Sequence, residues 1–311
     1  MRFAFTDEQL AFRDAVRELF ARECPPSTVR DAWTNDTGRT GTLWSRLAEM
    51  GVLGALLELR DVDVVLVLEE SGSAAVPEPL VEHSLAVPLL PDPARAAAGD
   101  ITVVTAFEGQ GVAAYAQSAD IVVTGGADGV FVLDDFDVTP ILGAVDGSRR
   151  LAQVSGSGTR VGDGDAFRAA FDRGALGTAA QLVGLGRRML DMTVAYVSER
   201  RQFGAPVGSF QAVKHRLADA RIALEFARPL VYRAAWSMSE ADAESSLHVS
   251  MAKAAAGDAA LLAARAALQC HGAMGYSFEY DLHLFMKRAW ALAAAWGDAA
   301  VHRAHVGRAI L

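Results

Sequence analysis

Cysteines and basic residues are scarce in this 311-residue sequence, and long apolar runs are absent. The two cysteines, Cys24 and Cys270, do not suggest a disulfide framework, and no Cys/His spacing indicates a metal site. The net charge of -9 argues against broad nucleic-acid binding, which needs a basic face, although it equally fits an acidic-leaning proteome. No apolar run could span a bilayer, and the N-terminus turns acidic at Asp7 instead of forming a signal peptide. We therefore expect a cytoplasmic protein with no nucleic-acid or membrane partner.

Three regions with different hydrophobic periods follow one another along the chain. Residues 1–98 are expected to form an N-terminal helical domain and residues 99–170 a small β-barrel domain. Residues 171–311 are expected to form a C-terminal antiparallel four-helix bundle. The sequence thus predicts a mainly α fold with a β middle domain.

Local signals place the first helices. Thr6 and Gln9 fit a capping box, which opens a helix that ends near Cys24, where two prolines follow. Further helices are expected at residues 42–50 and 63–70, before a proline-punctuated loop and short helical region.

The middle region is rich in β-branched residues and Gly/Asp turns, which indicates strands. The glycine-rich run 155–165 is expected to be a plain turn between strands, because it has neither a P-loop lysine nor a helix immediately after it. The expected strands are residues 101–106, 121–124, 130–133, 136–139 and 151–154.

The C-terminal region has the period of long amphipathic helices joined by short connections, which is typical of an antiparallel bundle. Pro229 falls inside one of these helices and is expected to kink it. Gly184 and Gly186 lie within a helical pattern, so close helix packing accounts for them. The expected helices are residues 174–200, 210–237, 240–268 and 281–295, with a short one to the end.

The most distinctive stretch, residues 198–219, predicts a helix end, a turn and a new helix. Gly204, Pro206 and Gly208 stop the first helix, and Ser209 is expected to cap the second. Two arginines, a glutamine and a phenylalanine lie between them, a set that can hold a diphosphate and stack a ring. The arginine pair could alternatively only complement the dipole at a helix C-terminus.

Two segments carry a family resemblance. Residues 198–219 contain Arg-x-Gln-Phe-Gly-x-Pro-x-Gly-x-Phe-Gln-x-x-Lys-His-x-Leu-Ala-Asp, and residues 269–289 begin with Gln-Cys-His-Gly-Ala-Met-Gly-Tyr. In this order they resemble signatures of the acyl-CoA dehydrogenase family of flavoproteins. The resemblance implies FAD as cofactor and α,β-dehydrogenation of a CoA thioester. Within the segments, His215, His271 and His283 are expected to be polar packing residues.

The resemblance also implies a glutamate base, which takes a proton from the α-carbon of the thioester. The family places this base in one of two positions, and they correspond here to Trp296 and Gly174. Neither residue can accept a proton, so the base is expected to be missing. Asp298 and Asp172 lie close by and are candidate substitutes, although acids near helix ends more often act as caps or solvated charges.

In the family, each flavin is shared between two subunits. This chain resembles a subunit that supplies residues for only one half of the shared flavin site. The family's flavin-ring segments have no counterpart in the middle domain, where the nearest candidate, residues 106–109, lacks the proline. The segment 57–61 replaces a longer loop, which suggests that the N-terminal domain no longer shapes a substrate site. The retained residues, which would hold the diphosphate and ADP end of a neighbour's FAD, are Arg200, Gln202, Phe203, Phe210, Gln211, Gln269 and Gly272.

This pattern resembles the short, half-degenerate partners in the heterotetrameric (α₂β₂) acyl-CoA dehydrogenases of actinobacteria, which act on steroid-derived CoA thioesters. The implied partner is a homologous catalytic subunit that binds most of the acyl-CoA, with an electron-transfer flavoprotein-type acceptor. Two alternatives stay open. The chain could be an autonomous homo-oligomeric flavoenzyme with Asp172 or Asp298 as base, or a flavin-free structural partner.

Overall fold

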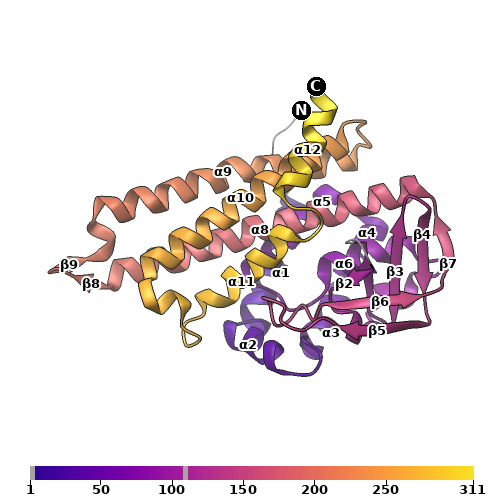
Figure 1. Ribbon diagram of the computed structural model, residues 1–311, viewed down its shortest axis with the longest axis horizontal. Coiled ribbons are helices and arrows are strands. Elements are labelled where there is room, and N and C mark those ends of the chain that lie inside the picture. Colours follow the sequence, from indigo (N-terminus) through magenta and orange to yellow (C-terminus); the bar gives the residue numbers. More distant parts are fainter. Residues whose placement is uncertain (1–3, 108–110) are drawn as a thin grey trace.

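The computed structural model describes residues 4–107 and 111–311. Figure 1 shows long C-terminal helices running side by side, with the strands gathered at the end opposite the β8–β9 hairpin. The fold is mainly α with a β middle region, as predicted. The N-terminal helices are α1 (Asp7–Glu23), α2 (Pro26–Thr34), α3 (Gly41–Glu49), α4 (Ala55–Glu58), α5 (Asp61–Ser73), α6 (Leu80–Ala86) and α7 (Ala94–Ala97).

The start of α1 is the predicted capping box. Thr6 Oγ1 accepts from the Gln9 amide, and Gln9 Oε1 accepts from the Thr6 amide at 2.7 Å. The prolines after Cys24 end α1, but they also begin α2, which the sequence pattern missed, because proline is tolerated at the first helical position. The segment 57–61 also contains the end of a short helix, α4.

Helices α5 and α8 (Gly164–Glu199) touch backbone to backbone. A Cβ at Gly72 would lie 2.1 Å from the Gln181 carbonyl oxygen, and one at Gly184 would lie 1.9 Å from the Glu69 carbonyl oxygen. Both positions therefore require glycine, which confirms the close packing predicted for Gly184. Helix α5 is buried over most of its length as a result.

The middle region is all-β, but its described strands form two separate sheets instead of one closed barrel. One sheet has the order β1-β3-β4-β7, with β1 and β3 parallel, and the other has the order β2-β6-β5. The strands are β1 (Val103–Ala106), β2 (Val112–Ala113), β3 (Ile121–Gly126), β4 (Gly129–Leu133), β5 (Phe136–Pro140), β6 (Ala152–Gly156) and β7 (Thr159–Gly162).

The expectation that no helix follows the glycine-rich run was wrong. Helix α8 begins at Gly164 because Asp163 caps it, accepting from the amides of Asp165 and Ala166 at 3.1 and 2.9 Å. The run itself supplies the end of β6 and then β7. The bundle's first helix therefore starts before residue 171, the expected domain boundary.

The predicted antiparallel bundle consists of α8, α9 (Gln211–Ser239), α10 (Ser245–His271) and α11 (Leu282–Ala294), followed by α12 (Ala299–Ile310) (Figure 1). Helix α9 continues through Pro229. Ser209 does not cap it, because the Ser209 hydroxyl donates to the Pro206 carbonyl and the backbone cap falls on Phe210.

A buried ionic network joins α1, α5, α8 and α9. Arg187 donates to Glu69 and Glu70 at 2.8 Å each. Arg17 also pairs with Glu70, and the Tyr232 hydroxyl donates to Glu69 at 2.6 Å. Each buried carboxylate therefore has charged or hydroxyl donors, which offsets the cost of removing it from water.

His83 joins the helical region to the first strand in a fixed neutral form. Its Nδ1 accepts from the Val103 amide at 3.1 Å, so Nε2 carries the proton and donates to the Ala96 carbonyl at 3.1 Å. Burial lowers the pKa of His83 from 6.5 to about 4.

Replacing His83 should make folding less sensitive to acid. Between about pH 6.5 and about pH 4 only the unfolded chain binds this proton, so stability falls as the pH drops through this window, by about 3 kcal/mol in total. Urea unfolding at about pH 7 and about pH 4.5 measures the loss. We expect a smaller loss in His83→Gln and an undiminished loss in His215→Gln, whose side chain is exposed. An equally steep loss in His83→Gln would contradict the buried neutral form.

Candidate functional site

The first signature segment forms a hairpin at the tip of the bundle, between α8 and α9 (Figure 1). Arg200 is the C-cap of α8: its amide donates to the Tyr196 carbonyl at 2.9 Å, and its carbonyl accepts from the Val207 amide at 2.7 Å. Strands β8 (Arg201–Gln202) and β9 (Ala205–Pro206) pair between these two bonds. Arg200 is thus held at the base of a short, hydrogen-bonded projection.

The two residues at the turn of this hairpin both have positive φ, 53° at Phe203 and 81° at Gly204. Two-residue hairpin loops require this conformation, which is unfavourable for a bulky residue such as phenylalanine. The Phe203 side chain is 93% exposed, and its ring meets that of Phe210 edge-on, at 6.3 Å between centroids. The hairpin therefore presents an aromatic ring to the outside of the chain.

The polar side chains of the two segments also face outward. Arg200, Gln202, Gln211 and Gln269 are exposed. Within the described part of the chain, no hydrogen bond or ion pair engages the Arg200 guanidinium. Arg200 also lies at the C-terminus of α8, where a cation complements the helix dipole, so the alternative that it only complements this dipole stays open.

The second segment ends α10 at the same end of the bundle (Figure 1). Gly272 is its C-cap, with φ 61° and ψ -140°, a conformation open essentially to glycine alone. A Cβ at Gly272 would meet nothing within 4 Å, so the space beside its backbone is open. An exposed guanidinium, amide side chains and accessible backbone suit a diphosphate brought from outside the chain. These residues therefore fit FAD as an incoming group.

An indole fills one of the two positions that the family resemblance assigns to the base. Trp296 is 1% exposed and has a positive φ of 57°. Its ring lies against Phe171 and Phe107, with centroids 5.6 and 6.1 Å away. A Cβ at Gly174 would lie 2.3 Å from Cε3 of Trp296. The two candidate positions for the base are thus in contact, and an apolar ring occupies the space between them.

Two residues that the sequence argument missed hold this turn in place. The buried Lys253 ammonium donates to the Gly297 carbonyl at 2.9 Å and to the Ala293 carbonyl at 3.2 Å. His302 Nε2 donates to the Trp296 carbonyl at 2.8 Å. Their contacts cross from other helices, so only the fold reveals them.

The two substitute acids have other partners. Asp298 is the N-cap of α12 and accepts from the amides of Ala300 and Val301 at 2.9 Å each. Both bonds lower the pKa of Asp298, and the bond from the Val301 amide has the larger effect. Burial raises the pKa of Asp172. Asp298 therefore caps a helix, which is the role that the sequence offered as the alternative to a catalytic one.

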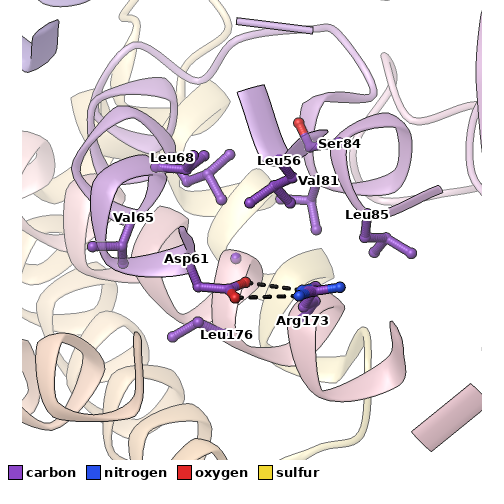
Figure 2. Close-up of a pocket in the computed structure, with 11 residues that line it drawn as sticks. Leu56, Asp61, Val65, Leu68, Val81, Ser84, Leu85, Arg173 and Leu176 are labelled. Atoms are coloured by element: carbon purple, nitrogen blue, oxygen red, sulfur yellow. Dashed lines mark hydrogen bonds and ion pairs between the residues drawn. The ribbon is translucent and has the colours of Figure 1, made fainter. Parts of the chain in front are cut away.

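A cavity lies where the shortened segment 57–61 meets α8. Figure 2 shows that an ion pair between Asp61 and Arg173 crosses it, among apolar side chains of α4, α5, α6 and α8. Arg173 Nε is 3.1 Å from Asp61 Oδ1. The cavity volume is about 20 Å³, room for about one water molecule, so it cannot hold an acyl chain.

Other ligand classes gain no support from the described residues. Within residues 4–107 and 111–311, no group of three or more His, Cys, Asp or Glu side chains could hold a metal ion. No helix in these ranges is long and apolar enough to cross a membrane. Of the flavin-ring candidate 106–109, residues 108 and 109 lie outside the described residues.

Family models match both ends of the chain: "Acyl-CoA dehydrogenase, N-terminal domain" over residues 6–90 and "Acyl-CoA dehydrogenase, C-terminal domain" over residues 162–311. Acyl-CoA dehydrogenase IpdE2 of Mycobacterium tuberculosis is 32% identical over 300 residues, which cover 91% of each chain. The chain therefore belongs to the acyl-CoA dehydrogenase family, whose members are FAD-binding flavoproteins.

Solved structures agree with the fold. A chain of the Tcur3481–Tcur3483 steroid acyl-CoA dehydrogenase superposes with a TM-score of 0.91 at 21% identity, covering 98% of each chain. A chain of the ChsE4–ChsE5 complex from Mycobacterium tuberculosis has a TM-score of 0.89 at 24% identity, covering 99% of this chain and 98% of that one. At these identities the likeness concerns the fold alone.

Gly174→Ala should destabilise the chain by roughly 1–3 kcal/mol, because the added methyl overlaps the Trp296 ring. In a Trp296→Leu background the penalty should shrink, since the smaller side chain leaves room for the methyl. A double-mutant cycle from denaturant unfolding measures this coupling. Gly257→Ala on α10 is the control: its Cβ meets nothing within 4 Å, and helix propensity predicts a gain of up to about 1 kcal/mol. An unchanged penalty in the Trp296→Leu background would place the clash elsewhere.

Proposed function

We propose that this chain is the non-catalytic subunit of a heteromeric, FAD-dependent acyl-CoA dehydrogenase. It donates contacts for the diphosphate and ADP end of FAD to a homologous catalytic subunit, which supplies the base and binds most of the acyl-CoA. When bound, FAD accepts the hydride of the α,β-dehydrogenation. The chain alone is inactive in this proposal, because it lacks the carboxylate that removes the α-proton.

The observation that carries the proposal is an asymmetry between the two ends of α8. At one end, Arg200 presents to the outside a guanidinium that no described residue engages. At the other end, Gly174 supports the indole that fills the base position. The two residues are roughly 40 Å apart along one continuous helix, at about 1.5 Å per residue. Arg200 therefore serves a cofactor that is held by another subunit.

Relatives support the finer parts of the proposal. The structural neighbours include a steroid acyl-CoA dehydrogenase and a ChsE4–ChsE5 complex, so we propose an α₂β₂ assembly acting on a steroid-derived CoA thioester. The site's position at the bundle tip suits a flavin shared at the subunit interface. An electron-transfer flavoprotein-type acceptor and a cytoplasmic location complete the proposal.

Arg200→Ala should release FAD from the complex of this chain with its catalytic partner. The wild-type complex should be yellow, with one FAD for each pair of subunits, and this chain purified alone should be colourless. The variant should lose most flavin absorbance, because a charge-assisted bond to the diphosphate contributes about 1.5–3 kcal/mol. Arg46→Ala, which removes an exposed arginine paired with Glu49, is the control and should keep its flavin. Full flavin content in Arg200→Ala would favour the flavin-free structural role.

Asp172→Asn and Asp298→Asn should leave the turnover of the co-purified complex unchanged. In the proposed function the partner supplies the base, and Asp298 caps α12, so neither carboxylate is expected to remove the substrate proton. The measurement is acyl-CoA-dependent bleaching of the flavin. A loss of about 100-fold or more in either variant would identify a base in this chain and contradict its proposed non-catalytic role.

A further inference from the structure

An aromatic cluster behind the two signature segments has no role in the function proposed so far. It consists of Tyr196 on α8, His271 at the end of α10, and Tyr280 just before α11. The Tyr196 and His271 rings stack, with centroids 4.3 Å apart and planes at 23°. The Tyr280 ring lies 4.9 Å from that of His271, which is only 4% exposed. The cluster joins the segments of the chain that carry Arg200 and Gln269.

Hydrogen bonds fix the protonation state of His271. Its Nδ1 lies 2.8 Å from the Ala267 carbonyl oxygen, which only accepts, so Nδ1 carries a proton. Its Nε2 lies 3.2 Å from the Tyr280 hydroxyl, and in the neutral ring this nitrogen accepts from that hydroxyl. Burial lowers the pKa of His271, which favours the neutral ring. A protonated ring would donate from both nitrogens, so the Tyr280 hydroxyl could no longer donate to Nε2 and that bond would have to reverse its direction.

Two members of the cluster, Tyr196 and His271, are connected directly to residues of the proposed site, and Tyr280 bonds to His271. The Tyr196 carbonyl accepts the Arg200 amide at 2.9 Å, so the stack sets where α8 ends. Gly272 follows His271 directly in the chain. A Cβ at Gly275 would lie 2.9 Å from the His271 Cβ, so the turn after α10 packs on the histidine. A displacement of the His271 ring would therefore move both segments relative to each other.

We propose that Tyr196, His271 and Tyr280 form a positioning clasp, which holds Arg200 and the Gln269–Gly272 turn at the spacing that the partner's FAD requires. The inference rests on the proposed function, since it assigns the clasp to that same site. Because the clasp uses the neutral histidine, FAD binding should weaken as the solution becomes acidic. The other titratable or charged groups around the cluster are Arg188 and Glu199 of α8 and Asp281 beside Tyr280.

Tyr280→Phe tests the clasp, because it removes the hydroxyl and keeps the ring. The measurement is the FAD dissociation constant of the co-purified complex, from flavin fluorescence, at about pH 7.5 and about pH 6. We expect roughly three- to tenfold weaker binding in Tyr280→Phe at the higher pH. We also expect a smaller pH dependence than in the wild type, whereas an effect that arose from Glu199 or Asp281 would persist in the variant.

Tyr232→Phe is the matched control. It also removes a buried hydroxyl hydrogen bond, to Glu69 at 2.6 Å, but in the ionic network instead of the clasp. It should lower thermal stability and leave FAD affinity unchanged. Unchanged FAD affinity in Tyr280→Phe would overturn the clasp, and so would equal weakening of FAD binding in Tyr232→Phe. In either case Arg200→Ala still tests the shared FAD site. Retention of FAD by Arg200→Ala overturns the proposed function itself, whatever Tyr280→Phe does.

Discussion

The backbone contact between α5 and α8 at Gly72 and Gly184 is the constraint on which the rest of the structure depends. It fixes α8 against the N-terminal helices with no space for a side chain between them. Arg187, one turn further along α8, then reaches the carboxylates of Glu69 and Glu70 on α5. Since α8 is continuous from Gly164 to Glu199, this one contact also sets the positions of both of its ends.

The two ends of α8 have different surroundings. Near its beginning, Gly174 lies under the Trp296 ring, which also packs against Phe107 and Phe171. Past its last turn, Arg200 and Phe203 are turned outward on a hairpin whose backbone adopts an unfavourable conformation. A strained backbone at an exposed aromatic turn is more readily explained at a binding surface than in a chain that binds no partner.

Short sequence patterns predicted the features that depend on residues close together in the chain. The Thr6 capping box, the helical bundle and the strand-rich middle region were visible because each is set by short-range pattern. The retained signature residues were visible for the same reason, since each segment is continuous in sequence. The start of α8 was missed because glycine-rich sequence usually indicates a turn, although Asp163 marks the cap. The contact of Trp296 with Gly174 was not predictable, because the two positions were identified separately and only tertiary packing brings them together.

The indole at position 296 also bears on how such a subunit evolves. A return to a carboxylate would empty the volume of a tryptophan ring beside Gly174 and would place a charge against Phe107 and Phe171. Both changes cost folding free energy, the first as a cavity and the second as an unpaired buried ion. A carboxylate at position 296 would therefore need compensating substitutions around it. Under the proposed function, selection on this chain can improve how it serves its partner but cannot readily release it from that dependence.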